Sequence, residues 1–243
     1  MSSNNSPRLE IRKTPKEVAN ACTDFIADSL RQTLKSQPHA TFAISGGSTP
    51  RPLFSALTSA DVQWSKVHFF WVDERCVPPT DDQSNYKLAN ETLLKPAKIS
   101  AANIHRIYGE INPEEAASRY VSEVRQFFKL TDSALPVFDL IHRGMGADAH
   151  TASLFPGSPL IRDMTHIAAH VWVEHLKMDR VTLLPGVLEA GKCTVLQVSG
   201  DDKKEAVRHV LKGGNDPMRY PCQIASRDER AVWFLDEAAA SMI

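Results

Sequence analysis

Residues 67–75 read V-H-F-F-W-V-D-E-R, and the change of character within this stretch indicates how the chain folds. The first six residues are apolar except for His68, which predicts a strand buried on both faces of a sheet. Three charged residues follow at once. In open α/β sheets ligands bind at the carboxyl ends of the strands, so this charged end is a candidate part of a site.

Strand-like and helix-like segments alternate on either side of this stretch. The capping-box sequence Thr14-Pro15-Lys16-Glu17 predicts the start of one helix, and Asn112-Pro113-Glu114-Glu115 predicts another. An Ala-rich helix is expected after Leu235. Further short apolar strands are predicted at Thr41–Ile44, Val137–Ile141, Cys193–Val198 and Val232–Leu235. The alternation favours βαβ units and a Rossmann-like α/β fold, a mostly parallel sheet with helices on both faces.

No internal repeat or Gly/Ser linker divides the 243 residues. We therefore expect residues 11–243 to form a single α/β domain, preceded by a flexible N-terminal tail over residues 1–10. We expect the protein to be a monomer or a weak homodimer.

Composition excludes several classes of partner. The 28 Lys+Arg and 29 Asp+Glu give a formal net charge of −1, which argues against a nucleic-acid binder. No apolar run approaches the ~18 residues of a membrane span, and the N-terminus lacks a signal peptide, so a cytoplasmic protein is expected. The four cysteines are scattered, which favours reduced thiols over disulfides or a zinc site.

A Gly-rich segment, S-G-G-S-T-P at residues 45–50, separates a predicted strand from a predicted helix. Backbone N–H groups, two hydroxyls and a helix start suit a phosphate or carboxylate, although the Lys of a Walker loop is missing. A tight turn with an ordinary Ser/Thr cap would have the same sequence pattern, so the sequence leaves both interpretations, an anion-binding loop and a structural turn, open. The candidate binding residues are Gly46, Gly47, Ser48 and Thr49.

Two more polar segments follow predicted strands. Asp73 can orient a sugar hydroxyl and Arg75 can clamp a phosphate, although in isolation a surface ion pair is the favoured interpretation of these residues. His150, in the loop G-M-G-A-D-A-H-T-A-S of residues 144–153, is the candidate general base for activating water, with Asp148 to orient it. Its position after a strand distinguishes His150 from the other eight histidines.

Three further cations could complete the site, namely Lys177, Arg180 and Lys203. Their alternative interpretation is that they are solvated surface charges. The chain has no G-x-S-x-G nucleophile elbow and no H-E-x-x-H metal motif. Its G-x-G at residues 144–146 lacks the rest of a dinucleotide fingerprint, so neither a metal nor a nicotinamide cofactor is expected.

Five segments, taken in order, resemble the 6-phosphogluconolactonase family of the glucosamine-6-phosphate isomerase/deaminase superfamily. They are S-G-G-S-T-P (45–50), F-F-W-V-D-E-R-C-V-P (69–78) with S-N-Y (84–86), G-M-G-A-D-A-H-T-A-S-L-F-P-G (144–157), R-V-T-L (180–183) and V-S-G-D-D-K (198–203). The resemblance spans nearly the whole chain beyond residue 15.

The resemblance implies hydrolysis of 6-phospho-D-glucono-1,5-lactone to 6-phosphogluconate in the oxidative pentose phosphate pathway, with no cofactor. His150 would activate the water, and Asp73 or Asp148 would orient the sugar or the imidazole. The phosphate and sugar hydroxyls of this small-molecule partner would be held by the loop of residues 46–49, by Arg75 and by one or more of Lys177, Arg180 and Lys203.

Two departures from the family pattern bear on the site. The family usually reads D-G-H where this chain has Asp148-Ala149-His150, and a left-handed backbone there would cost Ala of order 1 kcal/mol. The preceding strand usually ends in aliphatic residues, but here it ends in His142-Arg143.

Two other functions remain open. A glucosamine-6-phosphate deaminase typically has Tyr at the position of Arg75, and a Glu in an F-N-E-P stretch where this chain has Leu154-Phe155-Pro156. A non-catalytic sugar-phosphate sensor is supported only by Ala149.

Overall fold

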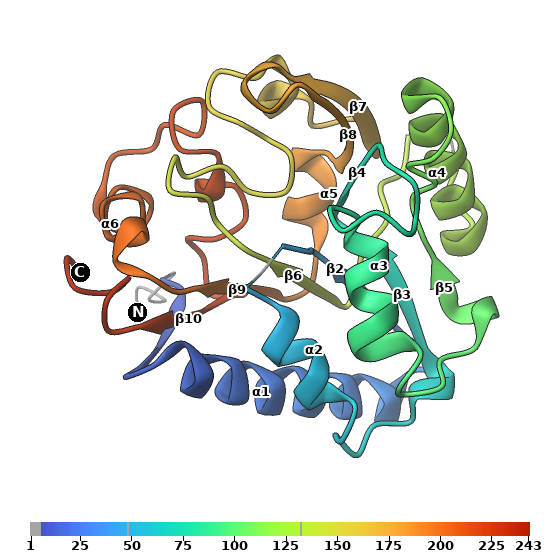
Figure 1. The fold of residues 1–243 in the computed structure, drawn as a ribbon, viewed down its shortest axis with the longest axis horizontal. Coiled ribbons are helices and arrows are strands. Elements are labelled where there is room, and N and C mark those ends of the chain that lie inside the picture. The colour runs from blue at the N-terminus through green and yellow to red at the C-terminus, as the bar shows by residue number, and fades with distance from the viewer. Residues whose placement is uncertain (1–5, 48, 132) are drawn as a thin grey trace.

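A seven-stranded parallel sheet forms the centre of the computed structural model, which describes residues 6–47, 49–131 and 133–243 (Figure 1). All neighbouring strands in this sheet pair in parallel, as the alternation of strands and helices predicts. Across the sheet the order is β1 (Arg8–Arg12), β10 (Ala231–Asp236), β9 (Thr194–Val198), β6 (Leu140–Arg143), β2 (Ala40–Ile44), β3 (Val67–Trp71) and β5 (Ile104–His105).

Helices connect these strands. The α-helices are α1 (Pro15–Ser36), α2 (Arg51–Leu57), α3 (Asn85–Ala89), α4 (Pro113–Phe128), α5 (Pro185–Ala190) and α6 (Lys204–Lys212), and a π-helical turn over Asn90–Leu94 continues α3. The predicted capping box begins α1, because the Thr14 hydroxyl accepts a hydrogen bond from the Glu17 N–H at 3.2 Å. Within the described ranges, no helix has the length and apolar character needed to cross a membrane.

The side chains of a single strand show that helices cover both faces of the sheet. Successive residues of a strand point to opposite faces. Val232 and Phe234 of β10 belong to the core that includes the buried face of α1, whereas Trp233 and Leu235 pack in the core that includes α6. Figure 1 shows α1 and α6 on opposite sides of β9 and β10, which confirms the predicted layers.

A second, three-stranded sheet was not anticipated. It is antiparallel, with the order β4 (Asp73–Arg75), β8 (Met178–Leu183) and β7 (Ala168–Val173). Strand β4 consists of the three charged residues that end the opening stretch, so no apolar pattern marks it as a strand. Its pairing with β8 brings the β7–β8 hairpin beside the carboxyl end of β3.

Two sequence predictions about the chain ends are wrong. The tail expected over residues 1–10 overlaps β1, where Arg8–Glu10 pair with Val232–Phe234; residues 1–5 of that prediction lie outside the described residues. The helix expected after Leu235 is a series of turns, in which the Asp236 carboxylate accepts a hydrogen bond from the Ala239 N–H at 2.8 Å. The backbone N–H groups of Ser241 and Ile243 bond to the carbonyls three residues back, at Ala238 and Ala240, so the α-helical pairing to the fourth residue back does not continue.

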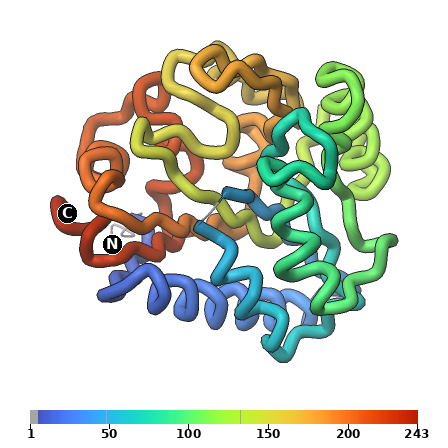
Figure 2. Tube along the Cα trace, in the orientation of Figure 1, coloured from blue at the N-terminus to red at the C-terminus, as the bar shows by residue number. Residues whose placement is uncertain are grey.

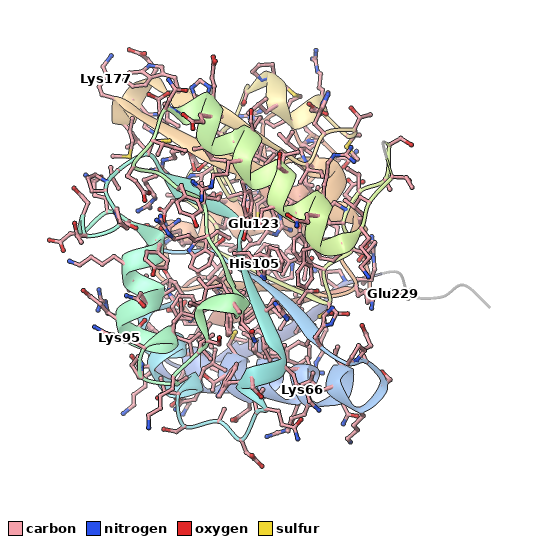
Figure 3. The ribbon with its side chains drawn as sticks, turned by 90° about the vertical axis from the view of Figure 1, so that its right-hand side faces the viewer. Lys66, Lys95, His105, Glu123, Lys177 and Glu229 are labelled. Carbon is pink, nitrogen blue, oxygen red and sulfur yellow. The ribbon has the colours of Figure 1, made fainter. Side chains whose placement is uncertain are left out.

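Histidines gather where β3 meets β5, at the opposite end of β3 from the charged residues. His68 Nδ1 lies 3.0 Å from His105 Nε2, and His105 Nδ1 lies 2.9 Å from the Glu123 carboxylate of α4 (Figure 3). The His39 ring centroid is 5.3 Å from that of His68. Burial, together with the neighbouring His105 and His39, lowers the pKa of His68 from its ordinary 6.5 to about 4.

This lowered pKa predicts a loss of stability in mild acid. Between pH 6.5 and 4 the unfolded chain takes up a proton on His68 and the folded chain does not, so the free energy of unfolding falls as the pH is lowered. After allowance for solvent screening of a partly exposed ring, we expect His68 to contribute about 1–2 kcal/mol to this fall. Urea denaturation at pH 7 and pH 4.5 of the wild type and His68→Phe measures it. Equal losses in both proteins would contradict the assignment.

Candidate functional site

The candidate site lies at the point where the strand order of the large sheet reverses. Strands β3 and β5 follow β2 on one side, and β6 lies on its other side, so the loops after β2 and β6 leave from neighbouring strands (Figure 2). A cavity of about 280 Å³ opens between these loops. This is where open α/β sheets place their ligands.

Most of the residues predicted from sequence line this cavity. They are Gly46, Gly47, Thr49, Asp73, Arg75, His150, Arg180 and Lys203. Asp148 lies directly behind His150 and contacts it. Ser48 lies outside the described residues. Lys177 is not brought to the cavity: it is exposed near the tip of the β7–β8 hairpin, at the edge of the molecule in Figure 3, where it pairs with Glu174.

His150 and Asp148 form a close pair. His150 Nδ1 lies 2.6 Å from Asp148 Oδ1, which also accepts the His150 backbone N–H at 3.1 Å. Partial burial acts to raise the pKa of Asp148, but its hydrogen bonds and electrostatic interaction with His150 outweigh burial and lower it to about 2. Because an ionised carboxylate only accepts hydrogen bonds, it holds the proton on Nδ1 and leaves Nε2 with its lone pair.

A tight turn positions this pair. Its hydrogen bonds run from the Ala149 N–H to the Gly146 carbonyl at 3.0 Å and from the Gly146 N–H to the His150 carbonyl at 2.9 Å. A Cβ at residue 146 would lie 2.1 Å from His150 Nδ1, so only glycine fits. Ala149 has φ +64°, the left-handed conformation considered in the sequence analysis, which costs alanine about 1 kcal/mol.

Asp73 is held by residues from two other segments. The Ser153 hydroxyl donates a hydrogen bond to Asp73 Oδ2 at 2.7 Å, and Asn85 Nδ2 donates one to the Asp73 carbonyl at 2.9 Å. Arg180 lies 3.9 Å from the same carboxylate oxygen. Asp73 is therefore fixed and buried at the cavity wall rather than part of the surface ion pair considered as an alternative.

The two arginines of the cavity are neighbours. Arg75 of β4 and Arg180 of β8 are directly paired positions in the antiparallel ladder. Arg75 donates to the Gln83 carbonyl at 2.5 Å, and the Nε atoms of both side chains have no hydrogen-bond partner within the described ranges of the chain. Burial lowers the pKa of Arg180, and the charge of Arg75 lowers it further, whereas Asp73 opposes the change. Two close guanidinium groups with free donors suit an anionic ligand.

The neighbouring Glu74 has a structural role that its sequence motif did not indicate. Its buried carboxylate accepts hydrogen bonds from the N–H groups of Arg75, Asn85 and Tyr86 at 2.7–2.8 Å and from the Ser84 hydroxyl at 3.1 Å. Burial raises the pKa of Glu74 to about 7, although the hydrogen bonds from the three backbone N–H groups act in the opposite direction. Glu74 thereby fixes the start of α3 against β4.

The glycines after β2 allow close approach in the cavity. A Cβ at Gly46 would lie 2.0 Å from Asn85 Oδ1, so residue 46 must be glycine for α3 to pack here. Gly47 has φ +92° and open space around it, which leaves its backbone accessible to a ligand. The described part of the Ser45–Pro50 segment therefore lines the cavity, and its role as an anion cradle stays a prediction.

Four polar residues line the cavity without having been among the candidate site residues, namely Ser45, Asn85, His142 and Gln197. His142 Nε2 lies 3.3 Å from Gln197 Oε1, and burial lowers the pKa of His142 to about 4. The two polar residues that end this strand, His142 and Arg143, therefore have different roles. His142 joins the cavity wall, while Arg143 is fully buried and donates to the Ile224 and Ala225 carbonyls at 2.6 and 3.0 Å. For Asn85, the S-N-Y motif was the available signal.

In the parts of the chain that the structure describes, no group of three or more His, Cys, Asp or Glu side chains is arranged to hold a metal ion. The chemistry available at the cavity is a histidine with a free Nε2, a paired carboxylate and a set of cations.

This chain is similar to a family model, to curated relatives and to solved structures. The family model described as "Glucosamine-6-phosphate isomerases/6-phosphogluconolactonase" matches residues 13–233. The chain is 33% identical over 220 residues to a 6-phosphogluconolactonase of Nostoc sp., with 90% of each chain covered. It is 32% identical over 236 residues to one of Synechocystis sp., covering 96% of this chain and 97% of the relative. The structure of 6-phosphogluconolactonase from Thermotoga maritima matches with a TM-score of 0.83 and 28% identity, covering 95% and 99% of the two chains.

The role of Glu74 predicts that an isosteric change is costly. In Glu74→Gln the new amide N–H₂ faces donors, which leaves buried groups unpaired, so we expect the free energy of unfolding to fall by about 2–4 kcal/mol at pH 8. Glu91→Gln, on the exposed side of the π-helical turn, is the matched control, with a change within about 0.5 kcal/mol. Similar urea midpoints for both variants would refute the anchoring role.

Proposed function

This chain belongs to the glucosamine-6-phosphate isomerase/6-phosphogluconolactonase family, and we propose that it hydrolyses 6-phospho-D-glucono-1,5-lactone to 6-phospho-D-gluconate, a step of the oxidative pentose phosphate pathway. One observation carries the proposal: the Asp148-paired His150 lines the same cavity as Arg75, Arg180 and Lys203. A base beside several cations suits a substrate with both a phosphate and a hydrolysable carbonyl.

The phosphate would be bound by the loop after β2 together with Arg75 and Lys203. Backbone N–H groups of a Gly-containing loop and a guanidinium are strong donors to phosphate oxygens. Lys203 pairs with Asp202 at 3.0 Å and lines the cavity from the segment after β9. The Asp73 carboxylate, fixed by Ser153, would accept a hydrogen bond from a sugar hydroxyl, and Arg180 would lie beside Asp73. Lys177 has no role in this arrangement.

His150 Nε2 would remove a proton from a water molecule as the water oxygen bonds to the lactone carbonyl carbon. The resulting tetrahedral intermediate collapses by breaking the bond between this carbon and the ring oxygen. The ring oxygen then takes the proton held by His150 and becomes a hydroxyl, while the new acid ionises to the carboxylate. The balance requires only lactone and water, and such a base contributes roughly 10²–10⁴ in rate.

The proposal predicts that His150→Ala lowers kcat by about 10²–10⁴-fold, with a smaller effect on binding of the product. The assay follows lactone loss above the spontaneous background, with the 6-phosphogluconate formed read by a coupled dehydrogenase. His166→Ala is the matched control, because it removes an exposed histidine that also pairs with an aspartate, 2.8 Å away at Asp163. It should leave kcat unchanged.

Three results would contradict this function in different ways. Full activity in His150→Ala would remove the base assignment. Ammonia release from glucosamine 6-phosphate would identify a deaminase. Tight binding of 6-phosphogluconate with no turnover by the wild type would identify a sensor.

The fit of Gly146 against His150 predicts a second loss of activity. In Gly146→Ala the new Cβ displaces the imidazole from Asp148, so kcat should fall by at least about tenfold, since catalytic geometry tolerates little displacement. Circular dichroism and the urea midpoint would show whether the fold is retained. Gly214→Ala, at a position with open space, is the control. Wild-type kcat in Gly146→Ala would show that the turn does not position the base.

A further inference from the structure

Phe155 contacts the proposed base without lining the cavity. Its ring centroid lies 4.3 Å from that of His150, with the two ring planes 29° apart. His175, from the β7–β8 hairpin, meets Phe155 edge-on at 5.1 Å, and the Arg180 guanidinium carbon is 5.6 Å from the Phe155 centroid. Neither the hydrogen bonds of the cavity nor the proposed reaction gives this half-buried ring a role.

We propose that the π face of Phe155 stabilises the positive charge that His150 acquires when it takes the proton of the attacking water. The inference rests on the proposed function, in which His150 is the base. An aromatic face attracts a cation within about 6 Å of its centroid far more than it attracts a neutral ring. The interaction therefore strengthens as the imidazolium forms, which is the condition for lowering an activation barrier.

Asp148 and Phe155 restrain His150 in complementary ways. The Asp148 carboxylate bonds Nδ1 at 2.6 Å, at the edge of the imidazole, and Phe155 packs against its face. Because Phe155 acts through His150 and does not line the cavity, it is a positioning residue rather than a catalytic one.

Stepwise fluorination of Phe155 tests this role, because each fluorine weakens the negative face of the ring with little change in its shape. We expect kcat for the lactone to fall steadily from phenylalanine through the mono-, di- and trifluoro forms, by about 2- to 30-fold in total. The KM should change little. Phe155→Leu should lose a similar factor, and Phe155→Tyr, which keeps an aromatic face, should recover most of it.

The matched control is the same series at Phe127, which is also half-buried and contacts His39, His68 and His105 away from the cavity. It should leave kcat unchanged. A merely structural Phe155 would tolerate fluorine, so a flat kcat across the Phe155 series would overturn the proposal.

A second readout does not depend on turnover. The midpoint of protonation of the His150 ring, followed by NMR, should move to lower pH with each fluorine at Phe155 and stay fixed in the Phe127 series. A fixed midpoint in both series would overturn the role of Phe155 even in an active enzyme. If the His150 midpoint shifts as expected across the Phe155 series but the wild type does not hydrolyse the lactone, the proposed function is refuted and the effect of Phe155 on His150 still stands.

Discussion

The repulsion between two facing guanidinium groups is the interaction around which the cavity is organised. Arg75 and Arg180 occupy paired positions on β4 and β8, where like charges destabilise an antiparallel ladder. Asp73 offsets part of this repulsion from 3.9 Å and is itself tied by Ser153. The offset is incomplete, because the Nε of each guanidinium lacks a hydrogen-bond partner among the residues that the structure describes. Under the proposed function, a dianionic phosphate bound nearby would complete this offset.

The topology of the sheet supplies the other half of the arrangement. The reversal of strand order between β2 and β6 places a glycine loop and a histidine loop next to each other at one sheet edge. The small sheet then adds Arg75 and Arg180 above them. Glu74 connects β4 to the start of α3 through three hydrogen bonds, from the Ser84 hydroxyl and from the N–H groups of Asn85 and Tyr86. A residue that stabilises the fold therefore lies between the two candidate binding residues Asp73 and Arg75.

The sequence predicts most of the large sheet, because its strands are short apolar runs separated by capped helices. It also predicts the cavity residues that directly follow β2, β3 and β6, since position relative to a strand is a property of sequence. Lys177 shows the limit of this reasoning: nothing local indicates that it lies near a hairpin tip and pairs with Glu174.

The residues that were missed depend on pairing between distant segments. Strand β4 has no apolar pattern, so its ladder with β8, and with it the small sheet, could not be read from either strand alone. Gln197 is an ordinary polar residue within the buried strand β9, and only the neighbouring β6 reveals that it faces His142 and the cavity. The left-handed φ of Ala149 could be predicted only because the family usually has glycine at this position.

The central claim is that the cavity is built for a phosphorylated sugar, and calorimetric binding of 6-phosphogluconate and gluconate tests it most directly. The account predicts that 6-phosphogluconate binds, that gluconate binds at least about tenfold more weakly, and that Arg75→Gln removes most of the difference, because charge-assisted hydrogen bonds to phosphate are lost. Equal affinity of the wild type for the two sugars, or an unchanged preference in Arg75→Gln, would contradict it.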